Sequence, residues 1–204
     1  VTVSSGQKRT VLLFEDITER VMAEERIHFI ARHDALTGLP NRSHFSTLAM
    51  EQLRLRADTG APSTLLIVDI DEFKHVNDSF GHVVGDELLR QSAERVRRAL
   101  PQQALLARLG GDEFIALLSP SAEHDGQAVA DQVLEAFQPS FMLNGLSLPV
   151  RASVGIVLSP NSRVDLEELM TKADLALYSA KAEGKGHGQV FHAHDHAGPL
   201  RLVR

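Results

Sequence analysis

Two adjacent carboxylates, Asp112 and Glu113, follow a Gly-Gly pair between two short apolar runs, Leu105–Leu109 and Phe114–Leu118. Two such runs joined by glycine predict a β-hairpin, because glycine adopts the positive φ angles of a tight turn without strain. Acidic residues in a turn are most often simply solvated. At the tip of a hairpin made by core strands, the same carboxylates can instead bind a metal ion or accept a proton.

A third carboxylate, Asp69, lies near the end of the apolar run Ser63–Ile70. This run predicts a strand buried on both faces, where an uncompensated carboxylate is costly. If the hairpin lies beside this strand, the three carboxylates converge and repel one another. A bound Mg²⁺ ion would resolve the repulsion, because it binds a few carboxylate oxygens and leaves positions for water and phosphates. The alternative is a set of neutralised carboxylates that share a proton.

Further residues could bind a phosphorylated substrate. A helix is expected to start near Asp71, and its first backbone N–H groups would form an anion site beside Asp69. Three lysines, Lys74, Lys181 and Lys185, could add positive charge for a triphosphate. Taken alone, each lysine is an ordinary solvated surface residue.

Two polar residues could bind the polar edge of a ligand. Asp86 can accept hydrogen bonds, and Asn77 can both donate and accept them. A site of this kind rejects ligands whose polar groups do not match, because the mismatched groups would be left unpaired. Each residue alone could equally be a helix cap.

The elements that must position these residues follow from periodicity and from turn residues. Thr18 is expected to cap a helix that runs to about His33, and Asn41 to cap the next helix. The remaining predicted elements are the strand 63–70, helices starting near Asp71 and at Gly85-Asp86, the hairpin, a helix around 130–137, a strand over 150–158, a helix capped by an Asp165–Glu168 box, and a last strand at 190–191. This order predicts an α/β (α+β) fold with helices on a mainly antiparallel sheet.

Composition excludes several classes of protein. With 204 residues and 43% hydrophobic content, the chain can bury one sizeable core and a short appendage. A net charge of −6 gives no basic footprint for nucleic acid, and the lack of cysteine excludes disulfides and thiolate metal sites. No apolar run approaches the roughly 18 residues of a membrane span, so we expect no membrane contact within this fragment. We expect a cytoplasmic location for it, and the parent protein could be membrane-anchored upstream. The chain starts at Val1 without a methionine or signal peptide, as expected for a fragment.

The hairpin sequence Gly110–Phe114 resembles the signature of the GGDEF family, the diguanylate cyclases. Other segments are similar to the remaining motifs of that family, in the family order, and several ordered motifs are far more specific than one. The similarity covers roughly residues 34–191. The matching segments are Asp34–Arg42, Asp69–Lys74, Asn77–His82, Gly85-Asp86 and Ala180–Lys185.

This resemblance implies a palm-like, ferredoxin-type sheet and a set of site residues. It implies that Asp69, the Ile70 carbonyl and Asp112 bind Mg²⁺, with Mn²⁺ as the alternative, and that Glu113 helps to remove the 3′-hydroxyl proton. The catalytic residues would be Glu113, Asp112 and Asp69. The substrate-binding residues would be Asn77, Asp86, Phe73, Lys74, Lys181 and Lys185.

The implied reaction joins two GTP molecules into cyclic di-GMP and releases pyrophosphate. One site holds one GTP, so catalysis would require a homodimer of facing domains. The alternative is a catalytically silent GTP-binding module that regulates an adjacent EAL phosphodiesterase domain. A scaffold fragment that binds no nucleotide would leave the motif spacing unexplained.

The domain organisation is also expected from resemblance. Residues 1–16 resemble the end of a PAS-like sensor domain, and residues 17–33 would form the signalling helix, either a solvated connector or a coiled-coil seam. The GGDEF domain would span 34–192. Residues 193–204 would be a tail, or the linker into an EAL domain.

The sequence departs from the family pattern at several positions. Asp112 stands where many members carry glutamate, Lys185 stands where arginine is common, and Gly186-His187 replaces the usual asparagine. Many relatives bind their product at an Arg-x-x-Asp motif, but its two positions are Pro101 and Ala104 here. We therefore expect no product binding on that surface.

Overall fold

The structure, a computed structural model, describes residues 16–57, 60–119, 125–159 and 165–192. The chain forms two compact units, Val1–Ala31 and Arg32–Arg204. Helix α1 (Thr18–Arg32) makes up nearly all of the described part of the first unit. The N–H of Thr18 donates to Asp16 Oδ1 at 3.0 Å, so Asp16 caps this helix and the prediction of Thr18 as cap is wrong. Residues 1–15 of the expected PAS-like segment and the tail 193–204 lie outside the described residues.

The second unit is built on a five-stranded sheet with the order β2-β3-β1-β6-β7. The central strand β1 pairs antiparallel with β3 and β6, β2 pairs antiparallel with β3, and only the β6–β7 pair is parallel. The mainly antiparallel sheet is therefore confirmed. Its strands are β1 (Ser63–Ile70), β2 (Leu105–Gly110), β3 (Glu113–Leu118), β6 (Ala152–Ser159) and β7 (Gly188–Val190).

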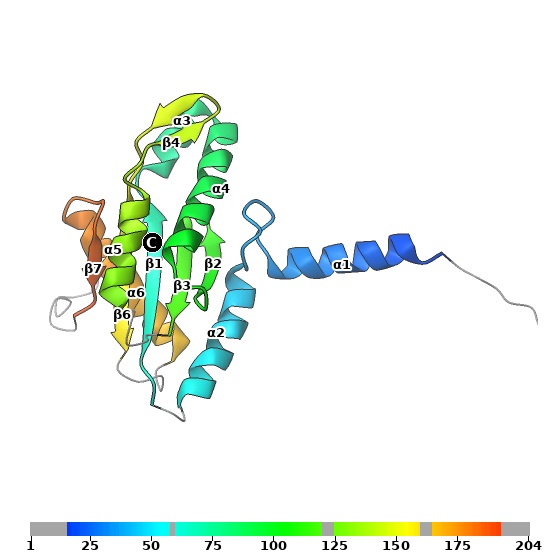
Figure 1. The fold of residues 1–204 in the computed structure, drawn as a ribbon, viewed down its shortest axis with the longest axis horizontal. Coiled ribbons are helices and arrows are strands. Elements are labelled where there is room, and N and C mark those ends of the chain that lie inside the picture. Colours follow the sequence, from blue (N-terminus) through cyan, green and yellow to red (C-terminus); the bar gives the residue numbers. More distant parts are fainter. Residues whose placement is uncertain (1–15, 58–59, 120–124, 160–164, 193–204) are drawn as a thin grey trace, which may run out of the picture. The chain divides into compact units, whose positions relative to one another are not determined.

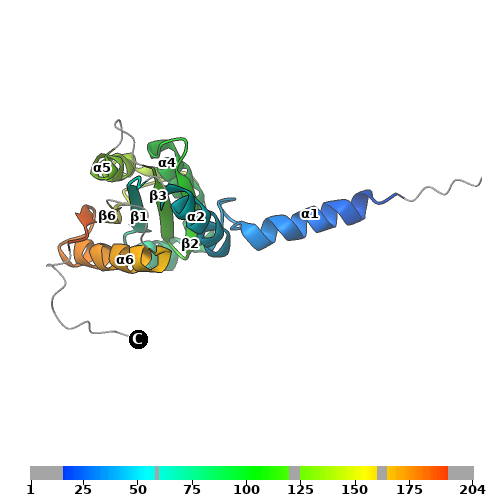
Figure 2. The ribbon, with the colours of Figure 1, turned by 90° about the horizontal axis from the view of Figure 1, so that it is seen from below.

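Helices cover both faces of this sheet (Figures 1 and 2). One face carries α4 and α5, and the other carries α2 and α6, as the hydrophobic clusters also show. The bounds of the helices are α2 (Arg42–Ala57), α3 (Phe73–Phe80), α4 (His82–Ala99), α5 (Gly126–Ala136) and α6 (Leu166–Ala182).

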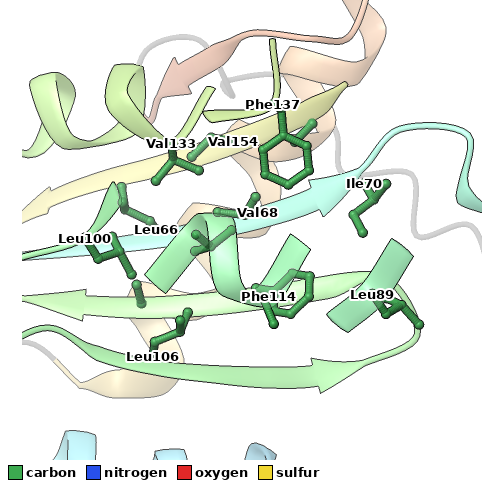
Figure 3. Close-up of a cluster of buried hydrophobic side chains, with 14 of the residues drawn as sticks. Leu66, Val68, Ile70, Leu89, Leu100, Leu106, Phe114, Val133, Phe137 and Val154 are labelled. Carbon is green, nitrogen blue, oxygen red and sulfur yellow. The ribbon is translucent and has the colours of Figure 1, made fainter. Parts of the chain in front are cut away.

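The side chains of β1 alternate between the two faces, and the whole strand is buried. Leu66, Val68 and Ile70 pack with Phe114 into the cluster beneath α4 and α5 (Figure 3). Leu65 and Ile67 pack into the second cluster, beneath α2 and α6. Asp69 has the same parity as Leu65 and Ile67, so the strand period directs its carboxylate toward the α6 face.

Helix α6 lies very close to strand β6 at Gly155. A Cβ atom at this position would clash with the backbone carbonyl of Ala173 and come within 2.7 Å of the Leu177 nitrogen. Only glycine permits this approach. The contact fixes the height of α6 above the sheet, and with it the position of Lys181 one turn further on.

The structure corrects three predictions about local structure. A second hairpin, β4 (Phe141–Leu143) and β5 (Leu146–Leu148), was not predicted. Helix α4 begins at His82, so Gly85-Asp86 lies inside its first turns instead of starting it. Asp165 occupies the N-cap position of α6, but its side chain makes no capping hydrogen bond. By contrast, Asn41 caps α2 as predicted, with Oδ1 accepting from the His44 N–H at 3.0 Å.

Candidate active site

The strand register brings the predicted carboxylates together. Asp69 on β1 pairs directly with Glu113 on β3, so their side chains emerge on the same face at the end of the sheet. Asp112 lies in the turn just before Glu113, and its carbonyl accepts from the Ile70 N–H at 3.3 Å. The end of β1 and the hairpin tip are therefore joined at the point where the three carboxylates meet.

Burial and mutual repulsion raise the pKa values of two of these groups. Burial raises the pKa of Asp69 to about 6, the hydrogen bond from Lys181 opposes this shift, and the nearby Asp112 charge adds to it. Burial also raises the pKa of Glu113, with further contributions from Asp174 and Asp112. Both shifts favour the protonated form over the ionised one, so a positive charge is needed to keep these carboxylates ionised together.

Lys181 contributes the one ammonium group that contacts Asp69 within the described residues. Its Nζ lies 2.7 Å from Asp69 Oδ2, and the carboxylate side chain is only 7% exposed. Lys181 was predicted to meet a triphosphate, and here it compensates a buried charge. Its own side chain is 37% exposed, so it can reach solvent and a ligand as well.

The hairpin tip is held by a second charged pair, which sequence reasoning missed. Arg108 donates from Nε and Nη2 to the Gly111 carbonyl, at 3.1 and 2.6 Å. Its Nη1 lies 2.9 Å from Asp34 Oδ1, which also accepts from Thr37. Although burial opposes the shift, the hydrogen bonds from Thr37 and Arg108 lower the pKa of Asp34. Arg108 therefore fixes the carbonyl that immediately precedes Asp112.

The predicted base-reading residues lie together on the other face of the sheet. Asn77 on α3 places its side chain over Gly85 on α4, where any Cβ atom would clash with the Asn77 amide. The ring of Phe73 lies beside the same glycine, and Asp86 is the next residue and is exposed. Within the described part of the chain, neither the Asn77 amide nor the Asp86 carboxylate makes a side-chain hydrogen bond, so both remain available to a ligand.

The predicted phosphate-binding groups are less closely gathered. Lys74 is exposed on α3, and Lys185 Nζ lies 3.2 Å from Glu72 Oε1. The backbone N–H of Asp71, expected to be free for an anion, donates to the Arg151 carbonyl at 2.9 Å. The Asp71 carboxylate accepts from Ser153 Oγ and from the Gly186 N–H, at 2.8 and 2.9 Å.

The Asp71 contacts have a positional role. They hold the loop that carries Lys185 against the residue after β1 and against β6, where Lys185 pairs with Glu72. Asp71 is a site-positioning residue that the sequence reasoning did not single out, although its place two residues after Asp69 was a signal.

The donor set at the carboxylate centre suits a divalent cation. Asp69 is a buried carboxylate next to two further acidic residues, and one ammonium does not neutralise all three. Among the described residues, no three His, Asp or Glu side chains form a complete protein-only metal cage. Mg²⁺ does not need one, because it commonly binds one or two carboxylates and completes its shell with water and substrate phosphates.

Comparison with known proteins identifies the family of this chain. Residues 31–187 match the family model described as "Diguanylate cyclase, GGDEF domain". The chain belongs to the GGDEF family. The solved GGDEF domain of TpbB (also called YfiN) from Pseudomonas aeruginosa PAO1 is similar with a TM-score of 0.74 and 34% identity, covering 80% of this chain and 96% of that one. The sheet and its helices are thus the palm-like fold of GGDEF domains.

Two curated relatives carry different names. Diguanylate cyclase TpbB from P. aeruginosa PAO1 is 36% identical over 81% of this chain and 38% of its own length. Cyclic di-GMP phosphodiesterase PdeR from Escherichia coli is 37% identical over 92% of this chain and 28% of its own length. The chain therefore spans less than two fifths of either relative. None of the described helices combines the length and apolarity needed to cross a membrane.

Proposed function

We propose that this GGDEF domain is a diguanylate cyclase, which condenses two GTP molecules into cyclic di-GMP and releases pyrophosphate. The observation that carries the proposal is the pairing of Asp69 with Glu113 beside the Asp112 turn. All three signature carboxylates are present, and they are close enough for the Asp112 and Glu113 charges to raise the pKa of Asp69, an effect to which burial contributes most. The relative TpbB, named a diguanylate cyclase, supports the same activity.

In this proposal, two groups of residues orient one GTP. Asn77 and Asp86 recognise the guanine edge, with Phe73 beside them, and Gly85 leaves room for the Asn77 amide. Lys74 and Lys185 bind the triphosphate, and Lys185 exchanges its Glu72 partner for phosphate oxygens. Lysine supplies charge here without the bidentate geometry of arginine.

The reacting groups lie at the end of β1. Asp69, the Ile70 carbonyl and Asp112 would hold Mg²⁺ or, alternatively, Mn²⁺, which when bound supplies a positive charge that polarises the α-phosphate and stabilises the leaving pyrophosphate. Without a bound ion, Lys181 neutralises Asp69. With an ion bound to Asp69, Lys181 would be free to contact a phosphate. Glu113 accepts the proton of the attacking 3′-hydroxyl group, and its raised pKa suits a general base.

The proposal extends to the organisation of the protein. One domain holds one GTP, so a homodimer of facing domains completes the reaction, in the cytoplasm where GTP is available. Residues 34–192 form the cyclase domain, and residues 17–33 the signalling helix. Residues 1–16 end a PAS-like sensor domain, and 193–204 form a tail or a linker to an EAL domain.

A second function is favoured by one observation. PdeR is named a phosphodiesterase and shares 37% identity with this chain over 28% of its own length. A domain of this kind can be a silent GTP-binding module that regulates a neighbouring phosphodiesterase. The complete set of carboxylates in this chain argues for the cyclase.

The deciding experiment incubates the purified chain with GTP and Mg²⁺ and measures cyclic di-GMP and pyrophosphate by chromatography. We expect both products in the ratio of one to two, and none from Asp112→Asn. Parallel calorimetry measures GTP binding. Binding of GTP without product, at any protein concentration that permits dimers, would establish the silent module instead.

A further inference from the structure

A pocket of about 270 Å³ adjoins the carboxylate centre on the α6 face of the sheet. Leu109, Met170 and Leu177 form its apolar floor. Its polar lining comes from α2, β3 and α6: Arg42, Glu113, Asp174, Tyr178 and Lys181. Glu113 and Lys181 thus belong both to this pocket and to the carboxylate centre.

The polar groups of this pocket are not paired with one another. Within the described residues, the side chains of Arg42, Glu113, Asp174 and Tyr178 make no hydrogen bond or ion pair, and the Tyr178 residue is 74% exposed. Burial raises the pKa of Asp174, opposed by the charge of Arg42. A cation, two carboxylates and an aromatic ring that converge without internal partners form a surface suited to a polar ligand. A ribose with its hydroxyl groups, next to a phosphate, offers the matching donors and negative charge.

The position of the pocket identifies which nucleotide it can take. In the sheet order β2-β3-β1-β6-β7, Asp69 on β1 is central, with the pocket on the β2–β3 side. Lys185 lies on the opposite side, where Gly186 is bonded to Ser153 of β6. The chain order is the same: Asp174, Tyr178 and Lys181 follow one another along α6, and Lys185 lies in the turn after its end at Ala182. The pocket and the triphosphate-binding lysine therefore flank the reaction centre.

Phosphoryl and nucleotidyl transfer place the attacking and leaving oxygens roughly in line, on opposite sides of the phosphorus. With pyrophosphate leaving toward Lys185, the attacking hydroxyl must approach from the pocket. We propose that this pocket is the acceptor subsite, which binds the ribose end of the nucleotide carried by a second copy of the domain. This inference rests on the proposed cyclase function.

The assignment gives each residue a role. The Arg42 guanidinium pairs with a phosphate oxygen of the incoming nucleotide, and Asp174 accepts from a ribose hydroxyl group. In the transfer step, the 3′-oxygen bonds to the α-phosphorus of the resident GTP. The bond from that phosphorus to the bridging oxygen breaks, its electron pair leaves with pyrophosphate, and the 3′-hydroxyl proton passes to Glu113.

The test separates the copy that performs transfer from the copy that only carries the incoming nucleotide. Full-length Asp112→Asn chain is added in large excess as the carrier, because it lacks a metal ligand and cannot transfer. In each dimer of a limiting test copy with a carrier, only the test copy forms a phosphodiester bond. The product is the linear dinucleotide, which is measured by mass spectrometry. Test copies are the wild type, Arg42→Ala and Asp174→Ala, with Arg54→Ala on α2 and Glu167→Ala on α6 as exposed controls.

We expect the Arg42→Ala and Asp174→Ala test copies to form the linear product roughly ten- to hundred-fold more slowly, the effect of one charge-assisted hydrogen bond. Arg42→Ala placed in the carrier instead, together with Asp112→Asn, should leave the wild-type test copy unaffected. Binding of a fluorescent GTP analogue to each single variant should match the wild type, which shows that folding and the resident GTP site are intact.

Three results would overturn the inference while leaving the cyclase function standing. The first is an unchanged rate of linear product formation for both variants. The second is a loss of rate when Arg42→Ala is in the carrier copy. The third is a parallel loss of GTP affinity in the variants, which would place the pocket in the resident GTP site. A wild-type chain that makes neither linear nor cyclic product would overturn the proposed function, and this inference with it.

Discussion

The β2–β3 and β4–β5 hairpins both turn on glycines with positive φ, Gly110 and Gly111 in the first and Gly145 in the second. The tip of the first is fastened by Arg108, which holds the Gly111 carbonyl, and by the bond from Ile70 to Asp112. The second is held along β4, where Phe141 and Leu143 are buried in the core. There Arg95 lies 3.5 Å from the centre of the Phe141 ring, and Gln91 donates to the Met142 carbonyl at 2.9 Å.

The two hairpins differ in whether specific polar contacts hold the tip. The tip that carries Asp112 is tied to two distant segments, directly through Ile70 and through Arg108 to Asp34, and the strands that lead to it are largely buried. The tip at Asn144-Gly145 is exposed, as are Met142 and Leu146 beside it. Burial of β4 and contacts to its strand are enough to hold the second hairpin, whereas the first also has a charged clamp at its tip, where a carboxylate must keep one position.

The largest expected effect comes from Asp112→Asn at the first tip. We expect turnover of GTP to fall on the order of a thousandfold, because a lost metal ligand forfeits several kcal/mol of transition-state stabilisation. The fold should persist, since the substitution opens no cavity. Circular dichroism and the GTP assay measure both. The matched change at the second tip, Asn144→Asp, should leave turnover unaltered, and near-normal activity of folded Asp112→Asn would refute the role of this carboxylate.

The next effect is that of releasing the clamp. Arg108→Ala leaves Asp34 partly buried and unpaired, so we expect a loss of about 2 kcal/mol in the free energy of unfolding. The freed tip should also lower turnover roughly ten- to hundred-fold, because small misplacements of a reacting group are costly.

The control for the clamp is Arg98→Ala, which breaks an exposed pair with Glu94 and should change stability by less than about 0.5 kcal/mol. Urea unfolding and steady-state kinetics give the two quantities. The loss in the double variant Arg108→Ala/Asp34→Ala should be smaller than the sum of the two single losses, because the second substitution removes only the Thr37 hydrogen bonds. Full additivity of the two losses would show that the pair does not act as a unit.

The free energy of unfolding should depend on pH through Asp69, which lies beside the first hairpin. The folded-state pKa of Asp69 is about 6 and its ordinary value 3.8, so the folded state binds a proton more tightly than the unfolded state. As the pH rises from 3.8 to about 6, ionisation of Asp69 lowers the free energy of unfolding by up to about 3 kcal/mol. Above that range Asp69 causes no further loss of stability.

Thermal unfolding in the absence of divalent ions can test this pH dependence. Asp69→Asn should flatten the stability profile between pH 4 and 6 relative to the wild type. Mg²⁺ should raise the melting temperature more at pH 7.5 than at pH 5, because protons compete for the same carboxylate. Equal stabilisation at both pH values would argue against Asp69 as a ligand.

A matched pair of glycine substitutions sharpens the comparison further. Gly111 has a φ angle of 54° and Gly145 one of 86°, and an added Cβ meets no atom within 4 Å at either position. Alanine should therefore cost about 1 kcal/mol of backbone strain at both. The two variants should melt at similar temperatures, but only Gly111→Ala should lose activity. A parallel loss of activity in Gly145→Ala would show that the second hairpin also takes part in catalysis.

The smallest effect concerns the opposite end of the first hairpin. The positions of the product-binding motif in many relatives are Pro101 and Ala104, which lie together in a shallow pocket with Arg97. Without the motif arginine and aspartate, cyclic di-GMP should not bind tightly there. Calorimetry should detect no tight complex, and added GTP should relieve whatever inhibition appears. Tight inhibition that GTP does not relieve would reveal another product site.

The sequence predicted the first hairpin and missed the second for physical reasons. Long apolar runs such as Ser63–Ile70 carry a strong signal, and a carboxylate inside such a run marks a site. The strands Phe141–Leu143 and Leu146–Leu148 are too short for their alternation to stand out, although the Asn-Gly turn between them was a usable signal.

Long-range pairing explains the residues of the site that were missed. Arg108 and Asp34 are 74 positions apart, and nothing in the local pattern of either indicates the other. The same holds for Arg42 and Asp174, which α2 and α6 bring to one pocket. Periodicity places a residue on a face of its own element, but the partner across the fold depends on how the elements pack.

The clamp also determines how the domain responds to mechanical load. The chain enters through a closed turn in which Asn41 donates to the Arg32 carbonyl at 2.9 Å, and Pro40 accepts from the Arg108 N–H at 3.0 Å. A pull or twist applied at Arg32 is therefore borne first by these bonds and by the Asp34–Arg108 pair, before the two hydrophobic clusters are strained. The first part of the domain to move under such a force is the strand that ends at the Gly111 turn.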